Sequence, residues 1–241
     1  MTNEPQLLYY VCYKPYNVIN QFSKAHPDHV SLQDIVKVPK DVYPVGRLDK
    51  DSEGLLLLTN DKSINTLLLQ PGSKKQKTYL VQVDGDITQD AVLKMSRGVE
   101  IKLDTGPYFT KPCDVKKLKQ PPGLPERNPP IRMRLHIPTS WIKITLTEGK
   151  NRQIRKMSAQ VGFPVLRLVR VQIQDLKIGN LQPGELKKMT RDIFFDLLQL
   201  PKDTPIKKPV IQERKITLKG KSSVKQKKHI KNTKSNSKYS R

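Results

Sequence analysis

The 241-residue chain has few cysteines, few acidic residues and no long apolar run. Its two cysteines, Cys12 and Cys113, lie far apart and outside any metal-ligand spacing, which argues against a disulfide framework and a zinc site. No apolar run approaches the roughly 20 residues that a membrane-spanning helix needs. The first residues lack the charged-then-apolar pattern of a secretory signal. Together these absences favour a reducing, cytoplasmic setting and no membrane association.

Basic residues outnumber acidic ones in both parts of the chain. Lys and Arg total 45 against 22 Asp and Glu, a formal net charge of +23. Residues 201–241 hold 14 basic and 2 acidic residues, and residues 1–200 hold the other 31 basic and 20 acidic ones. From Pro201 on, Lys, Ser, Asn and Gln dominate, a composition that cannot bury enough surface to fold alone. We predict a basic core over 1–200 and a basic, disordered tail over 201–241, both attractive to a polyanion.

Short apolar runs and helical patterns follow one another irregularly along residues 1–200. The segment 120–138 holds six prolines and cannot be regular throughout. Because strands and helices do not alternate strictly, we predict an α+β fold with a mixed, mostly antiparallel sheet flanked by short helices. Strands are predicted at 7–13, 55–58, 79–83, 99–103, 109–118, 141–146 and 165–173, and helices at 62–69, 88–97, 152–161 and 191–198.

The stretch Tyr43–Asp61 places a charged loop directly ahead of an apolar run. Leu55–Leu58 is apolar and is bounded by Gly54 and Asn60, which favours a buried strand over a helix. Charged groups just ahead of such a strand lie at the rim of a core, where a rigid scaffold can aim them. From charge composition alone, a solvated turn is the simpler interpretation. The exact order of the residues in this stretch decides between a functional loop and a solvated turn.

The motif GRLD at Gly46–Asp49, followed by SEGLLLLTND at Ser52–Asp61, closely resembles the signature loop of RNA pseudouridine synthases. This resemblance implies that Asp49 is the essential catalytic residue. It also implies the fold of that family's core, with two lobes around a central cleft. The resemblance extends from about Leu7 to Met189.

A narrower resemblance is to the bacterial RsuA-like branch that modifies ribosomal RNA, and within it to the E-type large-subunit enzymes. The segments Arg127–Arg132 and Ile137–Trp141 carry this narrower match. Many members of the branch begin with a small RNA-binding domain of the S4 type. Since the first strand is predicted to begin near residue 7, we expect no such domain ahead of the core, as in the E-type enzymes.

The implied reaction turns uridine into pseudouridine, which requires breaking the bond from ribose C1′ to base N1 and remaking it to C5. A carboxylate serves either as a nucleophile or to move a proton on the sugar, and Asp49 suits both roles. In a pocket mostly cleared of water, a guanidinium must keep this carboxylate ionised and oriented. The motif Asn151–Met157 resembles the family's basic motif, in which Arg155 is that partner. An ordinary helix-surface arginine is the competing interpretation.

Other elements of the resemblance concern the RNA. Lys77-Thr78-Tyr79 resembles the family's lysine–tyrosine element, which places Tyr79 against the target base after the base leaves its stack. Arg47 is suited to fill the gap left by the base or to hold a flanking phosphate. Lys14-Pro15 resembles a lysine–proline element near the start of the core, although an exposed lysine at a strand end explains it equally well. The predicted catalytic residues are Asp49, Tyr79 and Arg155, and the predicted RNA-binding residues are Arg47, Lys77, Arg152 and Lys14.

These observations predict a monomeric rRNA pseudouridine synthase that isomerises a specific uridine of large-subunit (23S) RNA without a metal or organic cofactor. One alternative is a non-catalytic RNA-binding or ribosome-assembly factor on the same fold. Another takes Asp49, Asp51 and Glu53 as the paired carboxylates of a glycoside hydrolase. The positive charge does not suit neutral sugars, so this alternative ranks last.

Overall fold

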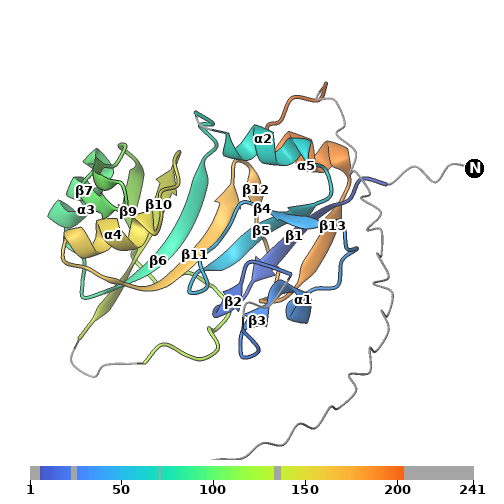
Figure 1. The fold of residues 1–241 in the computed structure, drawn as a ribbon. Helices are drawn as coiled ribbons and strands as arrows, with labels where there is room; N and C mark the ends of the chain where they lie inside the picture. Colours follow the sequence, from blue (N-terminus) through green and yellow to red (C-terminus); the bar gives the residue numbers. More distant parts are fainter. Residues whose placement is uncertain (1–5, 23–25, 71, 133–136, 204–241) are drawn as a thin grey trace, which may run out of the picture. The chain divides into compact units, whose positions relative to one another are not determined.

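The computed structural model describes residues 6–22, 26–70, 72–132 and 137–203 (Figure 1). The predicted tail lies outside the described residues from residue 204 onward. Within the described residues the fold is α+β, with one large sheet and short helices (Figure 1). The fold class predicted from the sequence is therefore confirmed.

The large sheet contains nine of the described strands, seven of them in the order β13-β1-β5-β11-β6-β10-β9. Strand β4 pairs with β5, and β12 pairs with β11. The pair β5–β11 is parallel, whereas the other printed pairs of this sheet are antiparallel. The bounds are β1 (Tyr9–Lys14), β4 (Tyr43–Val45), β5 (Glu53–Thr59), β6 (Lys77–Asp84), β9 (Asp114–Lys117), β10 (Thr139–Leu146), β11 (Val165–Ile173), β12 (Leu176–Lys177) and β13 (Leu186–Met189). Two small sheets pair β2 (Val18–Ile19) with β3 (Val30–Ser31) and β7 (Glu100–Leu103) with β8 (Gly106–Phe109).

Five helices are described, and side-chain acceptors occur at their starts, as three examples show. Thr88 accepts a hydrogen bond from Ala91 N at the start of α3, and Thr190 accepts one from Ile193 N at the start of α5. Asp61 Oδ1 accepts from Ser63 N at the start of α2. The helices are α1 (Leu32–Ile35), α2 (Ser63–Leu69), α3 (Gln89–Arg97), α4 (Gln153–Gln160) and α5 (Arg191–Leu197). None of the helices in the described part of the chain is long and apolar enough to span a bilayer.

Strand β5 is buried along its whole length, because apolar groups cover both of its faces. Leu55 and Leu57 belong to a core that also contains side chains of α2 and α5, including Phe194. Leu56 and Leu58 belong to a second core on the opposite face. A strand covered on both faces reads as a continuous apolar run, which explains the sequence at this point.

A separate core underlies the other end of the sheet. It joins α3 and α4 to β6 and β10, with Met95, Met157 and Ile142 fully buried. Figure 1 shows α3 and α4 together near β9 and β10, and α2 and α5 together near β4 and β12. Tyr79 of β6 packs against this core and also against the core that contains Leu56 and Leu58.

Gly54 allows β5 and β11 to approach closely. Its φ of +104° is one that L side chains rarely adopt, and an added Cβ would lie 2.2 Å from the carbonyl oxygen of Arg170. Gly54 and Arg170 are also register partners in the parallel pair. The glycine thus brings β11 directly beside the end of the loop that carries Asp49.

Some elements differ from the sequence prediction. The predicted strand 109–118 is wrong in its first half, because β8 ends at Phe109 and β9 begins only at Asp114. Pro112, which lies between the two strands, has no backbone N–H to donate to a neighbouring strand. In the same gap the Thr110 hydroxyl accepts a hydrogen bond from Val99 N. Helix α1 and strand β13 were not predicted, since one has a single turn and the other only two apolar residues. The described part of 120–138, which was predicted not to be regular throughout, contains no helix or strand.

Candidate active site

A cleft of about 900 Å³ opens between the two ends of the sheet. Its walls come from the β4–β5 loop, the α2–β6 loop, β6, β8, the β10–α4 loop and β11. Five of the seven residues predicted for the site line it, whereas Arg155 and Lys14 do not. Those five are Arg47, Asp49, Lys77, Tyr79 and Arg152.

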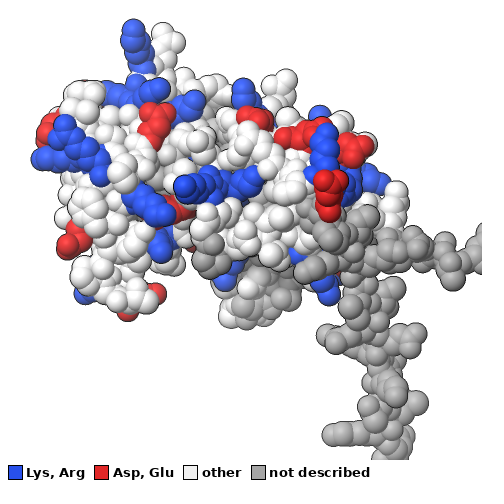
Figure 2. Space-filling view, turned by 90° about the horizontal axis from the view of Figure 1, so that it is seen from above, with Lys and Arg blue, Asp and Glu red and all other residues white. Residues whose placement is uncertain are grey.

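The cleft is strongly basic. Eight basic and two acidic residues occur in its described lining. Figure 2 shows Lys and Arg side chains spread over the face seen from above, with smaller groups of Asp and Glu between them. A concave surface of one sign raises the local concentration of an oppositely charged ligand. Among the described residues, no group of three or more His, Cys, Asp and Glu side chains is arranged to hold a metal ion.

The two acidic residues of the lining differ in their partners. Glu148 accepts hydrogen bonds from Tyr108 Oη at 2.6 Å and from Gln153 Nε2 at 2.6 Å, so it joins β8 to α4. Among the described residues, Asp49 forms an ion pair with Arg152, whose Nη1 lies 3.7 Å from Oδ2. The Asp49 side chain is 40% exposed. It therefore stands in an open part of the cleft and not in the dehydrated pocket that the implied mechanism predicts.

Asp51 holds both arginines of the basic motif. Arg152 donates to it in a bidentate manner, from Nη1 to Oδ1 at 3.0 Å and from Nη2 to Oδ2 at 2.8 Å. Arg155 places Nε 3.3 Å from Asp51 Oδ2 and donates from Nη2 to the Asp51 carbonyl oxygen at 2.6 Å. Burial opposes ionisation of Asp51, but the Arg152 hydrogen bonds and the Arg155 charge lower the pKa of its carboxyl below the ordinary value.

The predicted ion pair between Arg155 and Asp49 is therefore wrong in this structure. The reason is the shape of the loop, in which Ser52 N donates to the Asp49 carbonyl oxygen at 3.0 Å and makes a tight turn. This turn leaves Asp51 facing α4, while Asp49 faces the cleft. Arg152 itself has a left-handed backbone (φ +51°), a conformation that costs energy for a residue other than glycine and is common at functional sites.

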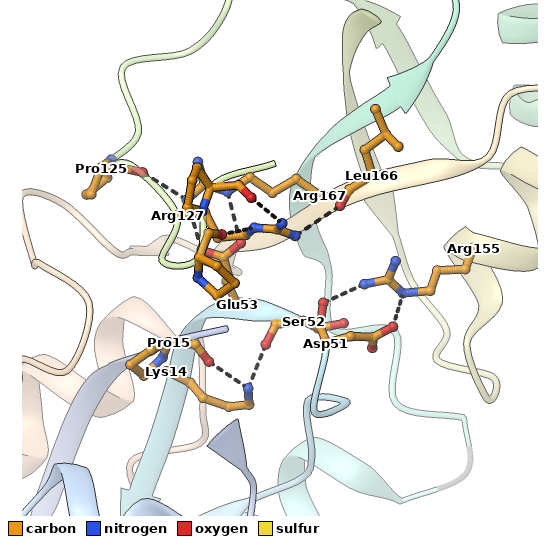
Figure 3. A network of polar contacts seen from close by, with 12 residues as sticks. Lys14, Pro15, Asp51, Ser52, Glu53, Pro125, Arg127, Arg155, Leu166 and Arg167 are labelled. Atoms are coloured by element: carbon orange, nitrogen blue, oxygen red, sulfur yellow. Dashed lines mark hydrogen bonds and ion pairs between the residues drawn. The ribbon is translucent and has the colours of Figure 1, made fainter. Parts of the chain in front are cut away.

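Lys14 supports the same loop from the other side. Its side chain is fully buried, and Nζ donates to the carbonyl oxygens of Ser52 at 2.7 Å, Pro15 at 2.9 Å and Lys50 at 3.4 Å. Figure 3 shows Lys14 and Arg155 reaching the loop from two sides. The prediction that Lys14 binds RNA is wrong for direct contact, since no part of the side chain reaches the surface.

Glu53 and Arg167 form a buried ion pair that the sequence did not reveal. Arg167 donates from Nε and Nη2 to the two carboxylate oxygens at 2.9 and 2.8 Å, and the side chains are only 7% and 2% exposed. Arg167 Nη2 also donates to the Pro125 carbonyl oxygen at 2.9 Å. This pair fastens the proline-rich segment to the sheet (Figure 3). It also keeps Glu53 buried, so Glu53 shares no surface with the partly exposed Asp49 and Asp51.

Tyr79 and Lys77 form part of the cleft wall on β6, where both are half-buried. Lys77 Nζ donates to the Lys75 carbonyl oxygen at 3.1 Å. Burial, aided by the charge of Arg170, lowers the pKa of Lys77. Arg47 is exposed at the edge of the cleft. The arrangement combines a carboxylate, an aromatic ring and several cations in one hollow.

Three known proteins that this chain resembles are described as pseudouridine synthases. Residues 8–160 match the family described as RNA pseudouridylate synthase. The chain is 47% identical over 176 residues to the ribosomal large subunit pseudouridine synthase E of Vibrio parahaemolyticus, covering 73% of this chain and 71% of the relative. The enzyme of the same description from Xanthomonas campestris is 45% identical over 173 residues, covering 71% of this chain and 90% of the relative. The dual-specificity RNA pseudouridine synthase RluF of Escherichia coli is 34% identical over 222 residues, covering 86% and 68%.

A solved structure described as a pseudouridylate synthase has the same fold. It superposes with a TM-score of 0.65 at 23% identity and covers 82% of this chain and 76% of its own. The matched region begins in the segment before β1 and ends with α4, so it contains both the Asp49 loop and the basic motif that holds it. With sequence and fold in agreement across the cleft, the chain belongs to the RNA pseudouridylate synthase family.

Proposed function

We propose that the chain isomerises one specific uridine of large-subunit (23S) ribosomal RNA to pseudouridine. The observation that carries this proposal is Asp49, a carboxylate that faces a basic cleft with Arg152 as its nearby cation. The relatives described as large-subunit pseudouridine synthases support the substrate class. The positive lining suits a polyanionic substrate.

The reaction needs no co-reactant, because it only moves one bond. The bond from uracil N1 to ribose C1′ breaks, the base turns, and a bond from C5 to C1′ forms. The proton on C5 is lost, and N1 takes up a proton. Asp49 acts at the sugar, either by attacking C1′ or by moving a proton of the ribose.

The other cleft residues have separate roles in this proposal. Tyr79 lies against the extruded base. This stacking offsets part of the cost of unstacking the base, which is on the order of a few kcal/mol. Arg47 and Lys77 hold the RNA around the target nucleotide. Arg152 is close to both Asp49 and Asp51, so it can meet a phosphate while keeping its charge near the carboxylate.

Arg155 acts as a positioning residue. It holds Asp51 through the side chain and the backbone, and Asp51 is two residues from Asp49. Lys14 holds the following backbone carbonyl, that of Ser52. Together they fix the loop on which the catalytic carboxylate stands, and a carboxylate must be held within a fraction of an ångström for efficient catalysis.

The proposal includes the setting of the enzyme. The core 1–200 acts as a cytoplasmic monomer, and the basic segment 201–241 adds sequence-independent attraction to RNA. Cys12 is buried and both cysteines are free, which suits a reducing compartment.

The decisive experiment maps pseudouridine in total ribosomal RNA from cells with and without the gene, by carbodiimide-dependent stops of reverse transcription. We expect one stop in large-subunit RNA to disappear without the gene and to return with the wild-type chain. Asp49→Asn should not restore it, whereas the matched variant Asp104→Asn, exposed in the turn between β7 and β8, should. Restoration by Asp49→Asn would refute the catalytic role, and an unchanged pattern without the gene would favour a non-catalytic RNA-binding factor.

A further inference from the structure

Arg170 is a buried cation in the wall of the cleft. Arg170 is one of the residues that line the cleft, yet it is only 5% exposed. Nε donates to the Leu55 carbonyl oxygen at 2.8 Å, which anchors one edge of the guanidinium to β5. Nη2 is also buried and has no hydrogen-bond partner among the described residues. One edge of the guanidinium is thus fixed, while the other carries a free donor.

An unpaired donor of this kind is rare inside proteins. Leaving a buried donor without an acceptor destabilises the folded state, and a charged donor does so more than a neutral one. Native proteins therefore pair nearly all such groups, and an exception calls for an explanation such as a catalytic role. A bound ligand that accepts a hydrogen bond from this donor would remove the destabilisation.

The position of Arg170 in the sheet, opposite Tyr79, indicates which part of an RNA ligand it would meet. Arg170 and Tyr79 are register partners in the antiparallel pair of β11 and β6, so their side chains stand on the same face of the sheet. Both line the cleft. A base lying against the Tyr79 ring is therefore on the same face of the sheet as the Arg170 side chain.

We propose that Arg170 is a further catalytic residue, which donates from Nη2 to a carbonyl oxygen of the extruded uracil. This inference rests on the proposed function. When the bond from N1 to C1′ breaks, its electron pair remains on the uracil and spreads onto O2 and O4. A fixed donor and a positive charge at one of these oxygens stabilise this anion until the pair is returned in the bond from C5 to C1′.

The burial of Arg170 argues against a phosphate as its ligand. Arg47, Lys150 and Arg152 are exposed residues of the same lining and are placed to meet the RNA backbone. Arg170 lies deeper, beside Leu168 and Ile173, which are buried apolar residues of the lining. A flat uracil with two carbonyl oxygens suits such a wall better than a hydrated phosphate does.

The first test measures single-turnover rates and RNA affinity for the full chain. Arg170→Met and Arg170→Gln should lower the rate by about 10²–10³-fold, the usual effect of removing one fixed donor from a developing anion. The dissociation constant for RNA should change by less than about threefold, because a buried residue contributes little to backbone binding. Arg97→Met, an exposed arginine on α3, should behave as wild type. Arg170 variants with rates within about threefold of wild type would overturn the inference.

The second test changes the substrate and keeps the wild-type protein. RNAs with 2-thiouridine or 4-thiouridine at the target carry a sulfur, which is a weak acceptor, in place of one carbonyl oxygen. One of them should react more slowly, and with that RNA the effect of Arg170→Met should shrink at least tenfold. Equal effects of the variant on all three RNAs would overturn the inference. If the Arg170 variants do not fold, wild-type rates decide, since two thio-substituted RNAs as fast as the normal one would also overturn it.

The two proposals fail in different ways. If the wild-type chain forms no pseudouridine in any ribosomal RNA, the proposed function fails and this inference fails with it. If the wild-type chain is active and the Arg170 variants are equally active, only the role of Arg170 is lost.

Discussion

Replacing Lys14 with methionine should change how the stability of the protein depends on pH. Lys14 is fully buried, and its Nζ donates to three backbone carbonyl oxygens. Burial is the main cause that lowers its pKa from the ordinary 10.5 to about 8, although the carboxylates of Glu53, Asp51 and Asp49 oppose the shift. Methionine has a similar length but no charge, so it removes the titration at this site.

The sign of the effect follows from proton binding in the two states. Below pH 8 the lysine is protonated in both the folded and the unfolded chain, and the cost of burying the ammonium is fully present. Between pH 8 and 10.5 the folded chain has lost this proton and the unfolded chain still binds it, so stability from this site rises with pH. With 1.36 kcal/mol per pKa unit, the gain from pH 8 to pH 10 is about 2 kcal/mol.

Urea unfolding of the wild type and of Lys14→Met, at intervals from about pH 7 to pH 10, measures this gain directly. The wild-type free energy of unfolding, relative to that of the variant, should rise by about 2 kcal/mol between pH 8 and pH 10. Burial raises the pKa values of the neighbouring Cys12 and Tyr13 to about 12, but both groups are present in both proteins and largely cancel. A difference that stays flat over this range would refute the assignment of a buried, titrating lysine.

Two further predictions concern the buried ion pair and the basic tail. Arg167→Met should lower the free energy of unfolding by about 3–5 kcal/mol, because it leaves the Glu53 carboxylate buried alone, and adding Glu53→Gln should recover part of the loss in urea unfolding. Single-variant losses that simply add in the double variant would contradict this coupling. Deleting residues 201–241 should weaken RNA binding and reduce the slope of log Kd against log salt concentration, as measured by fluorescence anisotropy. An unchanged slope would show that the segment makes no contact with RNA phosphates.

Local patterns in the sequence were sufficient for several features. The run of leucines predicted a buried strand, since β5 is apolar on both faces and its neighbours need not be known. The strand Val165–Ile173 and the helix ending near Leu198 were predicted at nearly their observed bounds, because each has a clear period or a cap. The signature loop placed Asp49 at the centre of the site, and the structure has it in the basic cleft with Arg47, Tyr79 and Arg152.

Only the tertiary structure decided which charged groups meet. Arg155 and Asp51 are 104 residues apart, and the turn at Ser52 determines that Asp51, and not Asp49, faces α4. Lys14 reads as a surface lysine, yet three backbone carbonyl oxygens converge on it inside the protein. Arg170 reads as an interruption of an apolar strand, and its free donor becomes visible only when β11 lies between β5 and β6. Composition and periodicity indicate which side chains are buried. The partner of a buried charged side chain depends on contacts between segments that are distant in the sequence, and the pattern of one segment does not contain this information.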